Sequence, residues 1–301
     1  MNLSAIKDEY PFKSHFLQIG PHKLHYIDEP EDNEGSEANG ETIVMLHGNP
    51  TWSFYYRKLA LNLREKYRVI APDHIGCGLS DKPQDYPYNL QTHIDNLSRL
   101  IDEKKLDKIT MAVHDWGGAI GFGWAVKNPE RVKRLIVFNT AAFRASLIPF
   151  SINICRIPFF GDVVVRGFNA FARSAIELGY ATSKPERFTK NVREGYLAPY
   201  DSWQNRIAIL RFVQDIPLEK GHPSYKLLES IENGLGRLAK KPMLIMWGMN
   251  DFCFTPLFLE MWMRRFPDAR VHKIEDAGHY VVEDAYERII PQVRDFMETA
   301  P

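Results

Sequence analysis

The chain has 301 residues, of which 45% are apolar and 12% aromatic, and its 38 basic residues balance 38 acidic ones. A chain of this size and composition can bury a large core, so we expect one large domain with an inserted subdomain. The charge balance gives no global electrostatic reason to expect nucleic acid or an anionic membrane as a partner. A small uncharged molecule is the simpler expectation.

The N-terminal "MNLSAIKDEYPFK" lacks the features of a secretory signal, and no run of about 18 apolar residues predicts a membrane span, so we expect a cytoplasmic protein. Cys77, Cys155 and Cys253 are odd in number and widely spaced, which favours reduced thiols over a disulfide framework or a zinc site. There is no G-x-G-x-x-G after a strand, no Walker sequence and no H-E-x-x-H. The sequence therefore predicts neither a metal nor a cofactor.

Apolar and β-branched runs predict strands near residues 15–19, 23–28, 42–46, 68–71, 108–113, 134–138, 242–247 and 269–274. These runs alternate with amphipathic segments, of which 90–101 is a clear example. Such alternation is typical of an α/β fold with a mostly parallel sheet and helices on both faces. The acidic, turn-rich stretch between the second and third strands predicts a solvated loop.

The alternation stops after the sixth predicted strand. Residues 144–238 show no strand pattern, but they contain helical stretches and many aromatic residues. We predict that they form a helical cap inserted into a core of residues 1–143 and 239–301, and we call them the cap segment. Such an insertion covers the carboxyl ends of the strands, where ligands bind in open α/β sheets. Tyr200 and Trp203 are candidates to face the ligand.

The stretch "VHDWGG" predicts a tight turn between a strand and a helix. Asp115 follows an apolar run and precedes Gly117 and Gly118, which leave room for the bend. A turn of this kind exposes its central side chain at the top of the sheet, and the next backbone N–H points to where an anion would lie. The usual nucleophile there is Ser in G-x-S-x-G, a motif absent from this sequence. Asp115 is the candidate nucleophile, although a single Asp after a strand is often only a helix N-cap.

Three further motifs follow predicted strands. "HGNP", which contains Asn49, comes after the third strand, where a second oxyanion donor is expected. Asp251 comes just after the strand that ends at Gly248, and His279 just after the last strand. The chain order Asp115, Asp251, His279 is the nucleophile, acid, base order of α/β-hydrolases. We therefore predict an α/β-hydrolase fold with these three catalytic residues.

Several of these motifs resemble known families. "HGNPTW", "DHIGCGLSDKP", "HDWGG" and "AGHYVVED" are similar to the haloalkane dehalogenases, and the similarity extends from about residue 15 to 298. "NTAAF", "APYDSWQNRIAILRFVQDIPL", "DFCF" and "EDAGHYVVED" resemble the β-lactone decarboxylases more closely. Those enzymes make cis-olefins from cis-3-alkyl-4-alkyloxetan-2-ones in bacterial long-chain hydrocarbon synthesis. We take this second resemblance as the nearer one.

The resemblance implies a role for each motif residue. Asp115 matches the nucleophile, His279 the base and Asp251 the acid that orients it. Asn49 and Trp116 match the pair that holds the departing halide in dehalogenases.

Two positions differ from related patterns. Some dehalogenases carry a catalytic Glu after the sixth strand, where this chain has Asn139, so Asp251 is the better candidate for the acid. Val113 replaces the first glycine of the general turn motif, a difference that the dehalogenase branch shares.

The residue types fit the implied chemistry. A carboxylate with a pKa of about 3.9 is ionised at neutral pH and needs no base to act as a nucleophile. It forms a stable ester by attacking a saturated carbon that bears a leaving anion, which a halide, an epoxide or a β-lactone provides. The predicted function is decarboxylation of cis-3-alkyl-4-alkyl-β-lactones to cis-alkenes and CO2, with a haloalkane dehalogenase second and an epoxide hydrolase third.

A catalytically silent binding protein of the same fold is disfavoured because both Asp115 and His279 are present. The role of His279 in a decarboxylase stays open at this point, as does the ring atom attacked. The resemblance also implies an assembly with the thiolase, reductase and β-lactone synthetase of the olefin pathway, which composition does not show.

Overall fold

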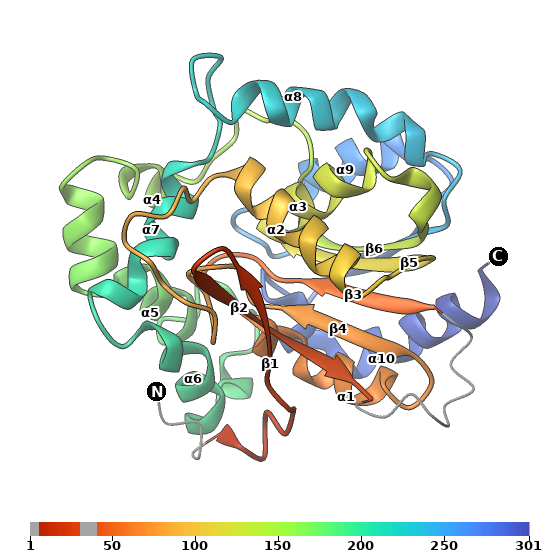
Figure 1. The fold of residues 1–301 in the computed structure, drawn as a ribbon, viewed down its shortest axis with the longest axis horizontal. Coiled ribbons are helices and arrows are strands. Elements are labelled where there is room, and N and C mark those ends of the chain that lie inside the picture. The colour runs from red at the N-terminus through yellow and green to blue at the C-terminus, as the bar shows by residue number, and fades with distance from the viewer. Residues whose placement is uncertain (1–5, 31–40, 301) are drawn as a thin grey trace.

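The computed structural model describes residues 6–30 and 41–300, and the predicted loop at 31–40 lies outside this part of the chain. A twisted sheet runs through the molecule with strand order β1-β2-β4-β3-β5-β6-β7-β8 (Figure 1). All eight predicted strands are present, which confirms the α/β fold. Their bounds are β1 His15–Ile19, β2 His22–Glu29, β3 Thr42–Leu46, β4 Arg68–Pro72, β5 Ile109–Asp115, β6 Val132–Thr140, β7 Met243–Gly248 and β8 Arg270–Ile274.

Most of the sheet is parallel. Strand β2 pairs antiparallel with both β1 and β4, and all other neighbouring strands run parallel. Every residue of β3, β5 and β7 is buried, as expected for parallel strands that are covered on both faces. The carboxyl ends of these three strands therefore meet at one edge of the sheet.

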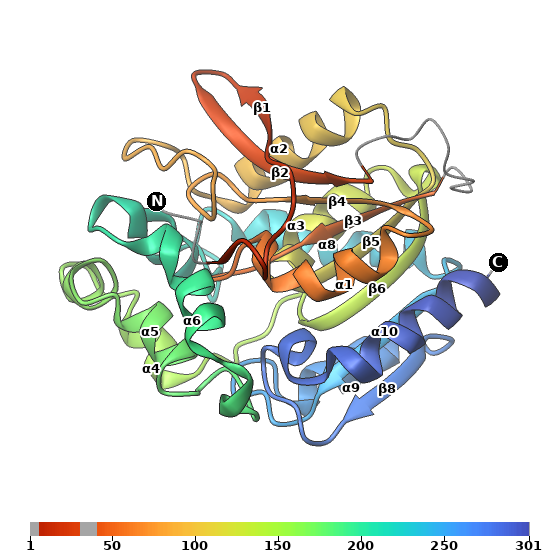
Figure 2. The ribbon, with the colours of Figure 1, turned by 90° about the horizontal axis from the view of Figure 1, so that it is seen from below.

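Two apolar cores lie on the two faces of the sheet. Helices α1 (Arg57–Leu63) and α10 (Val281–Thr299) pack into one core. The other core receives α2 (Leu90–Glu103), α3 (Trp116–Ala125), α8 (Tyr225–Gly234) and α9 (Pro256–Arg265). Figure 2 shows α1 and α2 on opposite sides of the strands. The side chain of Asn89 caps α2 by accepting a hydrogen bond from the Thr92 backbone N–H, so the predicted amphipathic helix begins there.

The described chain between β6 and β7 is helical, as the sequence predicts. It contains α4 (Phe150–Ile154), a π-helical turn η4 (Asp162–Gly167), α5 (Ala170–Ile176), α6 (Lys190–Leu197) and α7 (Ile207–Gln214). These helices gather at one end of the molecule (Figure 1, left). The last helix, α8, returns to the sheet, where it packs beside α3. Short 3-10 helices lie at η2 Ser53–Tyr56, η3 Pro129–Arg131, η5 Pro185–Arg187, η6 Ala198–Tyr200, η7 Gln204–Arg206 and η8 Leu235–Leu238.

Candidate active site

The turn between β5 and α3 places Asp115 at the top of the sheet. Asp115 is the last residue of β5, and its φ of 51° lies in the left-handed region that L-residues rarely adopt. The Thr140 hydroxyl donates a hydrogen bond to the Asp115 carbonyl and holds this strained backbone. A Cβ on Gly117 would lie 2.0 Å from the carbonyl oxygen of Leu46, so glycine is required where α3 passes β3. The predicted sharp turn is present, and it presents a carboxylate.

Backbone groups of two loops surround the Asp115 carboxylate, and we call them its cradle. Its Oδ1 accepts a hydrogen bond of 2.6 Å from the backbone N–H of Asn49. A Cβ on Gly48 would lie 2.0 Å from the same oxygen, so this close approach also requires glycine. Burial raises the pKa of Asp115, and the charge of His279 and the backbone N–H groups of Asn49 and Trp116 oppose that rise. The cradle therefore stabilises the ionised form of a buried nucleophile.

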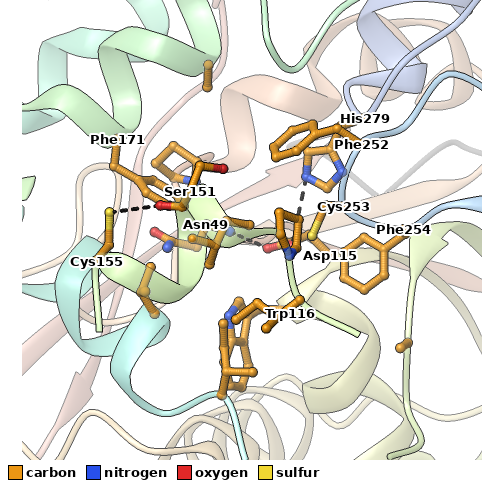
Figure 3. Close-up of a pocket in the computed structure, with 18 of the residues that line it drawn as sticks. Asn49, Asp115, Trp116, Ser151, Cys155, Phe171, Phe252, Cys253, Phe254 and His279 are labelled. Carbon is orange, nitrogen blue, oxygen red and sulfur yellow. Dashed lines mark hydrogen bonds and ion pairs between the residues drawn. The ribbon is translucent and has the colours of Figure 1, made fainter. Parts of the chain in front are cut away.

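Asp115, His279 and Asp251 form a row of three side chains with His279 in the middle. Figure 3 shows Asp115 and His279. Nδ1 of His279 lies 2.8 Å from Oδ2 of Asp251, and Nε2 lies 3.8 Å from Oδ2 of Asp115. The other Asp251 oxygen accepts hydrogen bonds from the backbone N–H groups of Cys253 and Phe254 at 2.7 and 3.0 Å. Burial lowers the pKa of His279, but the nearby carboxylates, Asp251 foremost and then Asp115 and Asp284, together outweigh that effect and raise it. The structure thus brings the three predicted residues together.

Asn49 and Trp116 flank Asp115 and line the same cavity (Figure 3). The side-chain N–H of Asn49 donates a hydrogen bond of 3.1 Å to the carbonyl of Ile209 in α7, and its Oδ1 is buried without a partner. The Trp116 ring packs against Phe212, with 5.3 Å between ring centroids. In this arrangement Asn49 contacts Asp115 through its backbone N–H, while its side-chain amide binds the cap segment.

A cavity of about 440 Å³ lies between Asp115 and the cap segment. Figure 3 shows Ser151, Cys155 and Phe171 on the cap side, facing Asn49 and Asp115 across it. Most of the lining is apolar; representative members are Ala119, Ile148, Ile152, Val164, Phe171, Val213, Phe254 and Phe258. A concave apolar space with a few convergent polar groups is typical of a site for a small apolar ligand.

The expectation that Tyr200 and Trp203 face the ligand is wrong. Neither residue lines the cavity. Tyr200 is fully buried, and its hydroxyl donates a hydrogen bond of 3.1 Å to the carbonyl of Thr51. Trp203 is 41% exposed and lies under the guanidinium of Arg166, 4.6 Å from the ring centroid. Tyr200 therefore joins the cap segment to the core, whereas Trp203 packs at the surface of the cap segment.

Two site residues beside Asp251 were not singled out from the sequence. The ring of Phe254 stacks on His279 with 5.8 Å between centroids and 20° between planes. Cys253 lines the cavity, and burial together with the nearby Asp251 and Asp115 raises the pKa of its thiol, which keeps it protonated. Both belong to "DFCF", so their position directly after the predicted acid was the available signal.

The loop that carries the predicted base is also tied to the cap segment. The Asp284 carboxylate accepts hydrogen bonds from the backbone N–H groups of Gly278 and Ser183, at 2.7 and 2.8 Å. The backbone N–H of Tyr280 donates a hydrogen bond of 2.7 Å to the carbonyl of Ala181. About a hundred residues separate the partners of the two contacts with Ser183 and Ala181, so nothing local in the sequence indicates them.

Asn139 occupies the position where some dehalogenases have their acid. Its side chain exchanges two hydrogen bonds with the backbone of Gly248, at 2.8 and 2.9 Å, and so joins β6 to β7. Both polar groups of the Asn139 side chain are therefore used to hold the sheet together.

Among residues 6–30 and 41–300, no group of three or more His, Cys, Asp or Glu side chains is placed to hold a metal ion. In the same part of the chain, no helix has the length and hydrophobicity needed to cross a membrane.

The sheet order and the strand-to-helix turn define a class of protein. A family model described as alpha/beta hydrolase fold matches residues 41–286. The chain therefore belongs to the α/β-hydrolase fold family, as predicted from the order of its motifs.

Individual relatives are more specific. The chain is 48% identical to the cis-3-alkyl-4-alkyloxetan-2-one decarboxylase of Shewanella oneidensis, over 95% of this chain and 89% of the relative. It is 42% identical to the enzyme of the same name from Xanthomonas campestris pv. campestris, over 97% and 98%. Among solved structures, haloalkane dehalogenase DatA from Agrobacterium tumefaciens C58 has a TM-score of 0.82 at 25% identity, over 95% of this chain and 96% of that one. Both predicted resemblances are confirmed.

Proposed function

We propose that this protein is a carbon–carbon lyase that converts cis-3-alkyl-4-alkyl-β-lactones into cis-alkenes and CO2. The observation that carries the proposal is the Asp115 carboxylate, held on a strained turn and facing an apolar cavity of about 440 Å³. Such a cavity offers room for alkyl chains beside a nucleophile that attacks saturated carbon. The two decarboxylases at 48% and 42% identity support this substrate class.

The site residues receive the following roles in the proposal. Asp115 is the nucleophile, and Asn49 and Trp116 stabilise the leaving carboxylate beside it. Asp251 orients His279 through the 2.8 Å contact and favours its protonated form. An imidazolium between the two carboxylates offsets their charge, whereas in a hydrolase the neutral imidazole of the same residue serves as the base.

The reaction balances without water or an external proton. A carboxylate oxygen of Asp115 bonds to the ring carbon that bears the alkyl group and the ring oxygen, and the electron pair of the broken C–O bond goes to the lactone carboxylate. The C–C bond to that carboxylate then breaks, its electrons form the double bond, and the Asp115 carboxylate leaves. Inversion followed by anti elimination turns a cis lactone into a cis alkene. Attack at the carbonyl carbon, giving a mixed anhydride, is the second route from the same nucleophile.

The test offers the purified protein a synthetic cis-dialkyl β-lactone and, in parallel, a 1-bromoalkane. Alkene is followed by gas chromatography and bromide by ion-selective electrode. We expect cis-alkene without bromide, and bromide without alkene would contradict the proposal.

Substitution of Asp115 tests the nucleophile. We expect Asp115→Ala to lower the turnover of the lactone by at least about a thousandfold, because no other carboxylate lines the cavity among the described residues. Asp268→Ala removes an exposed carboxylate in the loop before β8 and serves as the matched control, with unchanged turnover. Full activity of the Asp115 variant would remove the assigned role.

The second candidate function is a hydrolytic haloalkane dehalogenase, which the likeness to DatA favours. In that reaction water cleaves an aspartyl ester and His279 acts as the base. Epoxide hydrolysis ranks third: that activity uses a pair of cap tyrosines to open the ring, and in the described cap segment Tyr180 is the one tyrosine that lines the cavity.

We propose that residues 144–238 act as a cap on a core of residues 1–143 and 239–301, with α8 leading the chain back to the sheet. The three free cysteines fit a reducing compartment, which supports a cytoplasmic location. An assembly with the thiolase, reductase and β-lactone synthetase of the olefin pathway is proposed from the resemblance. Co-elution of the four purified proteins on size-exclusion chromatography tests it.

A further inference from the structure

The exposed large apolar side chains are concentrated in one part of the cap segment. We call residues 147–180 the apolar corner; they include α4, η4 and α5, which lie together at one end of the molecule in Figures 1 and 2. Phe159 is 86% exposed, Phe150 78% and Phe168 71%. The other exposed members are Leu147, Ile157, Phe160, Val163, Leu178 and Tyr180.

Charge is missing where this surface is most apolar. Between residues 147 and 172 the charged residues are Arg156, Asp162 and Arg166, and none of them is exposed. Further along the apolar corner, Arg173 and Glu177 are exposed but form an ion pair of 2.8 Å with no net charge. The same stretch lines the cavity from the inside with Ile152 and Val164. It is therefore apolar on both faces, whereas a cap that only covered a cavity would have a polar outer face.

The apolar corner is continuous with the mouth of the cavity. Leu147 and Tyr180 both line the cavity and are 49% and 64% exposed, so the cavity reaches the surface at these residues. An alkyl chain that leaves the cavity there passes directly onto exposed apolar side chains. Water is a poor solvent for such a chain, and a lipid bilayer is a good one.

We propose that the apolar corner docks on the surface of a lipid bilayer, so that apolar substrate and product exchange between the cavity and the lipid. The choice of lipid as the occupant rests on the proposed function, which supplies the apolar substrate. Because the exposed surface carries aromatic and aliphatic side chains and no exposed charge between residues 147 and 172, the binding is driven by apolar insertion. It therefore needs no anionic lipid.

The test is flotation of the purified full chain with phosphatidylcholine vesicles at low and at high salt. We expect the wild-type protein to float with the vesicles equally well at both salt concentrations. The triple variant Phe150→Ser, Phe159→Ser and Phe168→Ser should lose more than about tenfold in vesicle affinity, because each phenyl group buries apolar area on insertion. None of the three residues lines the cavity, so turnover of a short-chain lactone in water should stay unchanged.

A matched triple variant keeps the test specific. Phe16→Ser, Leu257→Ser and Met263→Ser removes three exposed apolar side chains outside the cap segment, and vesicle binding should be retained. Circular dichroism and thermal unfolding check that both triple variants are folded. A wild-type protein that does not float, or equal flotation of the two triple variants, overturns the proposal. So does a wild-type dimer that the apolar-corner variant converts to monomer without any effect on flotation.

Failure of the docking surface and failure of the proposed function give different results. Flotation does not depend on chemistry, so the Asp115→Ala variant should float like the wild type. Vesicle binding without alkene formation supports the surface and overturns the lyase assignment. Alkene formation without vesicle binding overturns the surface alone.

Discussion

The smallest unit that explains the site is a group of three charges. Asp115, His279 and Asp251 lie in a row, with His279 between two carboxylates. Burial disfavours the charges of Asp115 and His279, and the attraction between them offsets part of this cost. The pKa values of Asp115 and His279 therefore depend on each other and on the charge of Asp251.

This coupling predicts the effect of Asp251→Asn on the pH profile. The pKa of Asp115 is raised by burial, so kcat/KM should fall as the pH drops through a value above the ordinary one for aspartate. Without Asp251 the pKa of His279 falls, and a neutral His279 no longer stabilises the Asp115 carboxylate. The substitution also removes the repulsion by which Asp251 raises the pKa of Asp115, but that effect is smaller than the effect of His279. We expect the acidic limb of kcat/KM to move to higher pH and its maximum to fall by about 10²- to 10⁴-fold.

The control is Asp28→Asn. Asp28 lies on β2, away from the cavity, and its carboxylate pairs with Arg68 of β4. Its pH profile should match that of the wild type. An Asp251 variant with an unmoved acidic limb would contradict the proposed coupling.

At the scale of elements, the strands and helices with a regular spacing of apolar residues were the ones that could be predicted from the sequence. The eight strands and the helix near 90–101 follow from apolar spacing, and the turn at Asp115 follows from a strand, two glycines and a helix in succession. Tyr200 and Trp203 lie in a stretch of short 3-10 helices, where no period fixes the direction of a side chain. The link between Asp284 and the cap segment depends on tertiary contacts, which a single sequence does not contain.

The crossing of β3 and α3 predicts a loss of stability on Gly117→Ala. The added Cβ would meet the backbone carbonyl of Leu46 at 2.0 Å, and a backbone atom in a sheet cannot move aside cheaply. We expect a loss of about 1–3 kcal/mol in the free energy of unfolding, measured by urea denaturation. Gly236→Ala is the control, since a Cβ there meets nothing within 4 Å, and its change should stay within about 1 kcal/mol.

At the scale of the molecule, a buried ion pair joins the sheet helices to the cap segment. Arg57 of α1 is fully buried and donates hydrogen bonds to the Glu283 carboxylate of α10 at 2.6 and 2.8 Å. The hydroxyl of Tyr196 in α6 donates to the same carboxylate at 2.8 Å. One carboxylate therefore connects three helices that lie far apart in the sequence.

Glu283→Gln should destabilise the fold strongly. It removes the buried partner of the Arg57 guanidinium and leaves only the partly exposed Glu9 carboxylate, 3.1 Å from Nε, as its counter-charge. We expect a loss near the lower end of the about 3–5 kcal/mol that breaking a buried pair typically costs. Urea unfolding measures the loss. Glu298→Gln breaks an exposed pair with Lys66 and should change the stability by less than about 1 kcal/mol. Similar losses of unfolding free energy in the two variants would show that the buried pair stabilises the fold no more than the exposed pair does.

The hydrogen bond from the Tyr280 N–H to the Ala181 carbonyl spans the boundary between the core and the cap segment. Ala181 follows Tyr180 at the cavity mouth, and Tyr280 follows His279. The backbone at the cavity mouth is therefore joined directly to the backbone beside the imidazole. The shape of the entrance and the alignment of His279 thus depend on one main-chain contact.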